Sequence, residues 1–151
     1  MSRADPARVI AAARGWLGTP YHDQASLKGV GADCLGLARG VWREVIGPEP
    51  LAVPAYTRDW GETRAEEVLA LGALEWLVPE PVASAGPGSV VLFRMVPRAI
   101  AKHVGILTDK GTFVHAYFSL GVIEEDLTTA WKRRIAFSFQ FPEPGASDKE
   151  S

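Results

Sequence analysis

The order of patterns along the sequence predicts an α+β domain, with helices first and an antiparallel sheet of about five to six strands afterwards. Before Gly47, apolar residues recur with helical spacing. After the turn at residues 86–88, they fall in short runs rich in β-branched residues, and turn residues separate these runs. This change from helical to strand spacing is the main basis for the predicted fold class.

The composition is that of one globular domain. Of the 151 residues, 47% are hydrophobic and 23% charged, which excludes a disordered or coiled-coil protein. A net charge of −2 provides no electrostatic basis for a nucleic-acid partner, and no apolar run approaches the roughly 20 residues of a membrane span. The single cysteine excludes internal disulfides and multi-cysteine metal sites. We expect one domain over residues 1–144 and a flexible tail over 145–151.

The first predicted helix begins at Pro6 behind the N-cap residue Asp5, and Gly18 is expected to end it. Its apolar face is formed by Val9, Ile10, Ala13, Trp16 and Leu17.

The second predicted helix carries the cysteine. Asp33 is its expected N-cap, with a carboxylate placed to accept a hydrogen bond from the N–H of Leu35 or Gly36. Cys34 then lies in the first turn, where the helix dipole and free N–H groups favour the thiolate and lower its pKa. A buried structural thiol is the alternative. The apolar residues of this helix are Cys34, Leu37, Ala38, Val41, Trp42 and Val45.

Further along the chain, Thr63 and Glu66 form a capping box that predicts a short third helix through Leu71, ended by Gly72. The strands are expected at residues 89–95, 102–108, 112–117, 122–124 and 135–141, with a helical turn over 128–134.

Two of the three histidines lie on neighbouring predicted strands. If Asp109-Lys110-Gly111 form a three-residue loop, Thr108 pairs with Thr112, and His103 and His115 share one face of the sheet. A two-residue loop would place them on opposite faces. His22, in a polar loop, is expected to be solvated.

With Cys34, the two histidines make a candidate catalytic set. Cys34 would attack a carbonyl, His103 would keep the thiol ionised and later protonate the leaving amine, and His115 would hold the His103 ring. Backbone N–H groups at the helix start would stabilise the oxyanion, and Tyr21 would add a hydroxyl donor there. The spacing alone leaves a zinc site on the same three residues as an alternative.

Four segments, in order, resemble the NlpC-type cell-wall peptidases, a papain-like family of cysteine hydrolases. Residues 31–38 resemble the Asp-Cys-Ser-Gly-Leu/Phe-Val motif of that family, and residues 102–107 resemble its His-Val-Gly-Ile strand. Residues 112–116 are similar to its Phe-Ile-His-Ala strand, and residues 18–21 match its Gly-Thr-Pro-Tyr segment.

The resemblance implies a papain-like NlpC-type fold, with the nucleophile at a helix N-terminus packed on the sheet and no metal or other cofactor. It implies Cys34 as nucleophile, His103 as base and His115 as orienting residue. Tyr21 would lie beside them, and Asp33 would help to bind the amine of a substrate with a free L-Ala. The sequence departs from the family at Leu35, where serine is usual, and at Ser89, where aspartate is common.

The reaction that the resemblance implies is hydrolysis of a peptidoglycan stem-peptide amide, typically between γ-D-glutamyl and a diamino acid. The polar N-terminus does not fit a signal peptide, so we expect synthesis in the cytoplasm. The Asp-Cys-Leu-Gly-Leu form is similar to the phage tail-associated branch, and a tail or baseplate component meets the wall of the recipient from outside. The main alternative is a catalytically silent tail or baseplate module on the same fold. An acyltransferase of the related lipid-modifying families is less favoured, because there histidine usually precedes cysteine.

Overall fold

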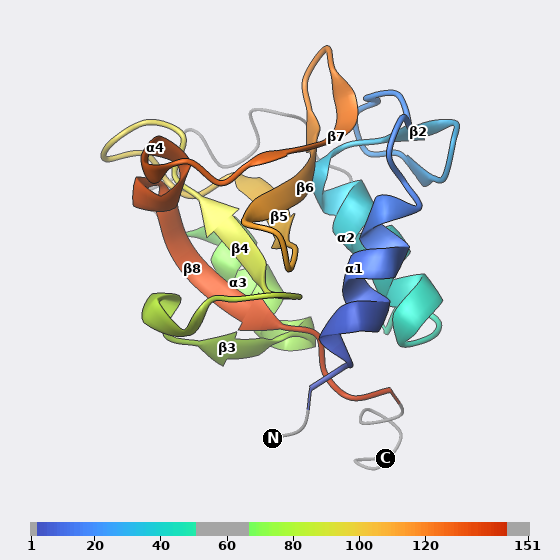
Figure 1. Ribbon diagram of the computed structural model, residues 1–151, viewed down its shortest axis with the longest axis horizontal. Helices are drawn as coiled ribbons and strands as arrows, with labels where there is room; N and C mark the ends of the chain where they lie inside the picture. The colour runs from blue at the N-terminus through green and yellow to red at the C-terminus, as the bar shows by residue number, and fades with distance from the viewer. Residues whose placement is uncertain (1–2, 51–66, 145–151) are drawn as a thin grey trace.

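A six-stranded antiparallel sheet in the order β3-β8-β4-β5-β6-β7 forms the centre of the computed structural model, which describes residues 3–50 and 67–144 (Figure 1). The α+β prediction and the predicted number of strands are confirmed. The strands are β3 (Val78–Glu80), β4 (Val90–Phe93), β5 (His103–Leu107), β6 (Thr112–Tyr117), β7 (Gly121–Asp126) and β8 (Ile135–Gln140).

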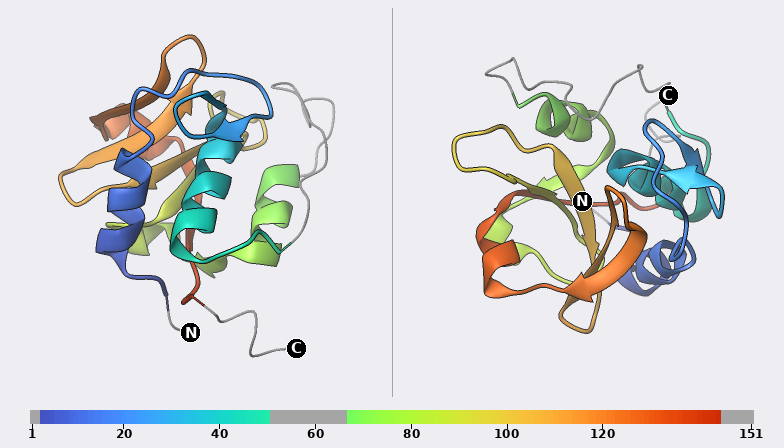
Figure 2. Two further views of the ribbon diagram at one scale, coloured as in Figure 1. Left: turned by 90° about the vertical axis from the view of Figure 1, so that its right-hand side faces the viewer. Right: turned by 90° about the horizontal axis from the view of Figure 1, so that it is seen from above.

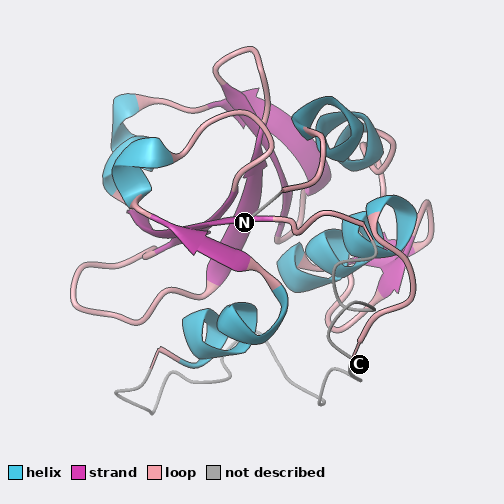
Figure 3. Cartoon of the chain, turned by 90° about the horizontal axis from the view of Figure 1, so that it is seen from below, coloured by secondary structure: helices cyan, strands magenta, loops and turns pink. Residues whose placement is uncertain are grey.

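Helices flank this sheet (Figure 3). Helices α1 (Pro6–Arg14) and α2 (Cys34–Val45) cover one face. Helix α3 (Val68–Trp76) lies beside α2, where the rings of Trp42 and Trp76 are 5.6 Å apart (Figure 2). The remaining elements are the short helix α4 (Thr129–Arg133), the 3-10 turn η1 (Val82–Ser84), and a two-stranded sheet of β1 (Ser26–Leu27) and β2 (Gly31–Ala32).

The two faces of the large sheet differ in character, because successive side chains of a strand point to opposite sides. The aliphatic face packs against α1 and α2 in the main core and consists of Val90, Leu92, Val104, Ile106, Val114 and Ala116. On the other side, the aromatic face packs against Trp131 of α4 and consists of Val91, Phe93, His103, Phe113 and His115.

The predicted first helix is right at its start and wrong at its end. Asp5 caps it through a 3.0 Å bond from the N–H of Ala7 to its carboxylate. The helix ends at Arg14 rather than running to Gly18, because the backbone bonds then tighten to i→i−3: the N–H of Trp16 donates to Ala13 and the N–H of Leu17 to Arg14. Leu17 therefore falls outside the apolar face and is 43% exposed.

The second helix is confirmed from Cys34 to Val45, but the predicted end of the third is wrong. Helix α3 continues through Gly72 to Trp76, because an isolated glycine costs only about 1 kcal/mol in a helix interior. The capping box at residues 63–66 and the tail at 145–151 lie outside the described residues, so the domain boundary at 144 stays a prediction.

Three short strands were not foreseen. Strand β3 contains Pro79, which a sheet tolerates on an edge strand, and β3 pairs only with β8. Strands β1 and β2 have two residues each and lie in the loop before α2. The helical turn between β7 and β8 is confirmed as α4. None of the helices in the described ranges is long and apolar enough to cross a membrane.

Candidate active site

Of the two loop lengths that the sequence left open, the hairpin that carries the two histidines has the loop of three residues. Ile106 lies opposite Val114, and the N–H of Thr108 donates to the carbonyl of Thr112 at 3.0 Å. This register places both histidines on the aromatic face. Nε2 of His103 lies 2.7 Å from Nδ1 of His115, so the two imidazole rings share a hydrogen bond.

A second hydrogen bond holds His115 from its other side. Its Nε2 lies 2.7 Å from Oε2 of Glu125 on β7, and the indole N–H of Trp131 donates to Oε1 of the same carboxylate at 3.2 Å. Sequence analysis missed Glu125 because the predicted strand ended one residue earlier. The signal was the strand alternation, which places Glu125 opposite Phe113 and diagonal to His115 once β7 is extended.

Cys34 lies at the first turn of α2, against the start of β5. Its Sγ donates to the carbonyl of Lys102 at 3.7 Å, and the backbone N–H of Val104 also bonds the sulfur. These two backbone groups flank His103 in the chain. The structure therefore brings the thiol to the strand that carries His103, and the thiol bonds the backbone there rather than the imidazole.

The protonation of these groups differs from the sequence prediction. Burial raises the pKa of the Cys34 thiol to about 12, and the neighbouring charge of Asp33 adds to the rise. The expected lowering by the helix N-terminus is thus wrong, because loss of solvation outweighs it. Burial, with a smaller contribution from His115, lowers the pKa of His103 to about 3. Both Cys34 and His103 are therefore neutral at pH 7.

His115 is also held in its neutral form. Its side chain is fully buried, and burial lowers its pKa although the hydrogen bond and charge of Glu125 act in the opposite direction.

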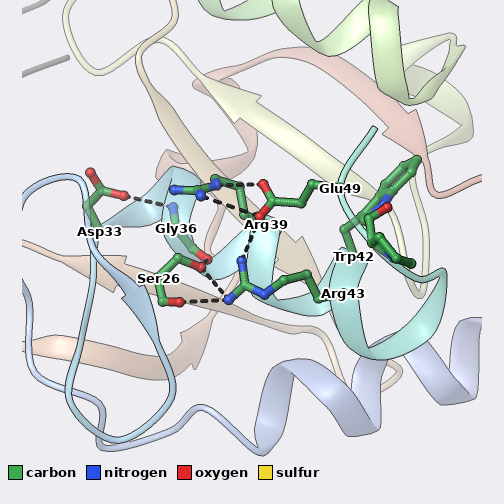
Figure 4. Close-up of polar contacts among 8 residues, drawn as sticks. Ser26, Asp33, Gly36, Arg39, Trp42, Arg43 and Glu49 are labelled. Carbon is green, nitrogen blue, oxygen red and sulfur yellow. Dashed lines mark hydrogen bonds and ion pairs between the residues drawn. The ribbon is translucent and has the colours of Figure 1, made fainter. Parts of the chain in front are cut away.

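Asp33 is the N-cap of α2, as predicted, and it also binds the preceding loop. Its Oδ1 accepts from the N–H of Gly36 at 2.7 Å, and its Oδ2 accepts from the N–H of Gln24 at 2.8 Å. Ser26 donates to the carbonyl of Gly36 at 2.6 Å (Figure 4). A Cβ on Gly36 would lie 1.9 Å from the carbonyl oxygen of Ala25. The loop and the first turn of α2 are therefore packed backbone to backbone.

Tyr21 lies near this turn. Burial raises its pKa, and the Cys34 thiol once it is ionised and the nearby carboxylates of Asp33 and Asp23 raise it further. Its ring meets that of Phe118 edge to face, with the centroids 5.6 Å apart. The oxyanion role of Tyr21 and the amine-binding role of Asp33 stay predictions.

Ser89 belongs to a different polar cluster. Its hydroxyl donates to Oε2 of Glu80 at 2.7 Å, and Ser138 and Gln140 donate to the same carboxylate. Glu80 on β3 thus supplies a carboxylate beside the position where the sequence lacks aspartate. The cluster joins β3, β8 and the residue that precedes β4, and it contains none of the three candidate catalytic residues.

The zinc arrangement that the spacing left open is not formed. Within residues 3–50 and 67–144, no group of three or more His, Cys, Asp or Glu side chains is placed to hold a metal ion. His22 lies apart from the two paired histidines on an exposed loop, as expected.

No protein-family model and no curated protein matches the sequence, whereas solved structures match the fold. An NlpC/P60 family protein from Bacillus cereus ATCC 10987 has a TM-score of 0.63 at 18% identity, over 92% of this chain and 41% of that chain. The NlpC/p60 domain of the peptidoglycan hydrolase SagA has a TM-score of 0.59 at 20% identity, over 91% of this chain and 99% of that domain.

The peptidoglycan hydrolase RipB from Mycobacterium tuberculosis has a TM-score of 0.55 at 22% identity, over 91% of this chain and 65% of that chain. The chain therefore spans less than half of the B. cereus protein and nearly all of the SagA domain. From these superpositions and the arrangement of its helices and strands, the chain has the NlpC/P60 fold.

Proposed function

We propose that the protein is a cysteine peptidase that hydrolyses an amide bond in the stem peptide of peptidoglycan. The observation that carries the proposal is the hydrogen-bonded pair of His103 and His115 on the strands beside the single thiol, Cys34. The proposal is also supported by the fold, since SagA and RipB share it and are described as peptidoglycan hydrolases.

In the proposed reaction, Cys34 is the nucleophile and His103 is the base. Nε2 of His103 is bonded to His115, so Nδ1 is the nitrogen that takes the thiol proton as the sulfur attacks the carbonyl. His103 then gives this proton to the leaving amine as the carbon–nitrogen bond breaks. Water hydrolyses the resulting thioester and restores the thiol.

The neutral state of both groups means that the proton moves during the attack rather than before it. The thiol hydrogen must therefore turn from the Lys102 carbonyl to His103 when substrate occupies the site. The N–H groups at the start of α2 and the Tyr21 hydroxyl would stabilise the oxyanion, and Asp33 would bind the amine of the substrate.

The proposed bond is that between γ-D-glutamyl and a diamino acid, and the proposed setting is the tail or baseplate of a phage or phage-like particle. The bond rests on the resemblance of the four motifs to the cell-wall peptidases, and the setting rests on the resemblance of the Asp33–Leu37 segment to their tail-associated branch. Complete, purified tails that lacked this chain would contradict the setting and leave the chemistry unaffected.

Purified sacculi provide the test of the activity. We expect the wild-type protein to release muropeptides and Cys34→Ala to release none, because the chain has no other thiol. Mass spectrometry of the products from a defined muropeptide identifies the bond. Equal release by wild type and variant, at equal thermal stability, would support the silent structural module instead.

A further inference from the structure

We propose that Glu125 is a positioning residue that sets the direction of the hydrogen bonds through both histidines, so that His103 presents an unprotonated Nδ1 to Cys34. The effect of Glu125 on catalysis rests on the proposed function. The tautomers that it predicts are a property of the resting protein and can be measured without substrate.

The direction is set at the outer end of the chain of hydrogen bonds. The indole N–H of Trp131 is a donor only, so Oε1 of Glu125 accepts from it at 3.2 Å. An ionised carboxylate only accepts hydrogen bonds, so its Oε2 requires a proton on Nε2 of His115, which lies 2.7 Å away. Glu125 thus assigns the Nε2–H tautomer to His115.

This assignment passes to the second ring. A neutral imidazole carries one N–H, so Nδ1 of His115 has a lone pair and accepts from Nε2–H of His103 at 2.7 Å. His103 is neutral as well, since burial and the neighbouring His115 lower its pKa to about 3. Its Nδ1 is then a base, as removal of the thiol proton requires.

The groups around the two histidines are mainly aromatic, so Glu125 is the charged group that sets the direction of their hydrogen bonds. His115 is fully buried and His103 is only 9% exposed, so water is excluded from the bond between them. Among the described residues, the aromatic side chains that contact these rings are Phe93, Phe113, Tyr117 and Trp131, none of which is a carboxylate.

Glu125→Gln is the informative variant, because Trp131 fixes the orientation of the new amide. The indole N–H needs an acceptor, so the amide oxygen faces Trp131 and the NH₂ group faces His115. Nε2 of His115 must then accept, which moves the proton to its Nδ1. Nδ1–H donates to Nε2 of His103, whose own proton then lies on Nδ1, where it blocks proton transfer from the thiol.

The test is long-range ¹H–¹⁵N NMR of the histidine rings in the full chain, which distinguishes Nε2–H from Nδ1–H. The chain has only three histidines, and His22→Gln assigns the third. We expect Nε2–H on both His103 and His115 in the wild type, and Nδ1–H on both in Glu125→Gln. Nδ1–H on either ring of the wild-type protein would overturn the proposal, whether or not the variant folds. So would a folded Glu125→Gln that keeps both wild-type tautomers.

Glu124→Gln is the matched control, since it removes the same charge at the adjacent residue. Glu124 accepts from Arg14 and Thr112 and does not contact the histidines. We expect it to keep the wild-type tautomers and the wild-type kcat.

In the hydrolysis assay, Glu125→Gln should lower kcat on the order of 10²–10⁴-fold with little change in KM, since a wrong tautomer in a serine triad costs up to about 10⁴-fold. Absence of hydrolysis by the wild-type protein would count against the proposed function and leave the NMR result on Glu125 valid. A wild-type kcat in Glu125→Gln would overturn the catalytic part of the inference.

Discussion

The two faces of the central sheet use the same strands for different purposes. On the aliphatic face, Val104 and Ile106 of β5 are buried beneath the helices and contribute apolar area to the main core. On the aromatic face, His103 of the same strand takes part in a run of hydrogen bonds that reaches Glu125 on β7.

One short strand thus contributes to stability on one face and, in the proposed mechanism, to chemistry on the other. Burial of an aliphatic side chain stabilises the fold, whereas burial of a histidine disfavours its charged form and changes its chemistry. The two effects should therefore separate on substitution: changes to the histidines of the aromatic face should lower activity, and changes to the aliphatic side chains of the other face should lower stability.

The largest effect is expected from His103→Gln on the aromatic face. Loss of the proposed base should reduce the rate of muropeptide release by at least about 10³-fold, as removal of a member does in established catalytic triads. The measurement is the rate on purified sacculi, with His22→Gln as the control because that histidine is exposed. If His103→Gln retained most of the activity, the aromatic face would have no role in the chemistry.

On the aliphatic face, Ile106→Ala should destabilise the protein by about 2–5 kcal/mol, because it leaves a cavity beneath the helices. Ile106 is 0% exposed, whereas Val96 is 60% exposed, so Val96→Ala serves as the control with little effect. The measurement is urea unfolding. Below its unfolding transition, Ile106→Ala should keep its specific activity, and a loss as large as that of His103→Gln would remove the distinction between the faces.

A smaller effect is expected from pH. His103 stays neutral in the folded protein down to about pH 3, whereas in the unfolded chain it titrates near its ordinary pKa of 6.5. The unfolded state therefore binds more protons between these values, so the free energy of unfolding should fall as the pH is lowered from 6.5. His115 acts in the same direction, because its pKa is also lowered.

The slope contributed by His103 should reach up to about 1.4 kcal/mol per pH unit. Urea unfolding between about pH 5.5 and 8 measures it, above the range in which the carboxylates with lowered pKa values, ordinarily 4.5, begin to bind protons in the unfolded chain. His103→Gln should flatten the slope. A wild-type stability that does not change with pH in this window would show that His103 gains its proton while folded.

Local patterns predicted the parts of the fold that local interactions determine. Helix α2 follows from its apolar spacing and from Asp33, whose cap reaches only to Gly36. The register of the β5–β6 hairpin follows from a loop of three residues between Thr108 and Thr112. In both cases the interacting residues are only a few positions apart in the chain, so the interaction can be predicted from the local sequence.

The features that were missed depend on partners far away in the chain. Strand β3 exists because it pairs with β8, and Glu80 accepts from Gln140 across that pair. The pKa of Cys34 was predicted from its helix position alone, whereas its direction is set by burial against β5. Glu125 comes within hydrogen-bond distance of His115 only when β7 is paired with β6.

The close packing of Gly36 against Ala25 bears on how the nucleophile motif should be interpreted in other sequences. Asp33 and Gly36 hold a loop against a helix, and a Cβ at Gly36 would collide with that loop. A protein that lost its activity and kept this fold would still need both residues. Their presence is therefore a marker of architecture, and a search that scores them detects enzymes and inactive descendants equally. In the proposed mechanism, Cys34, the two histidines and Glu125 are the residues whose loss would distinguish one from the other.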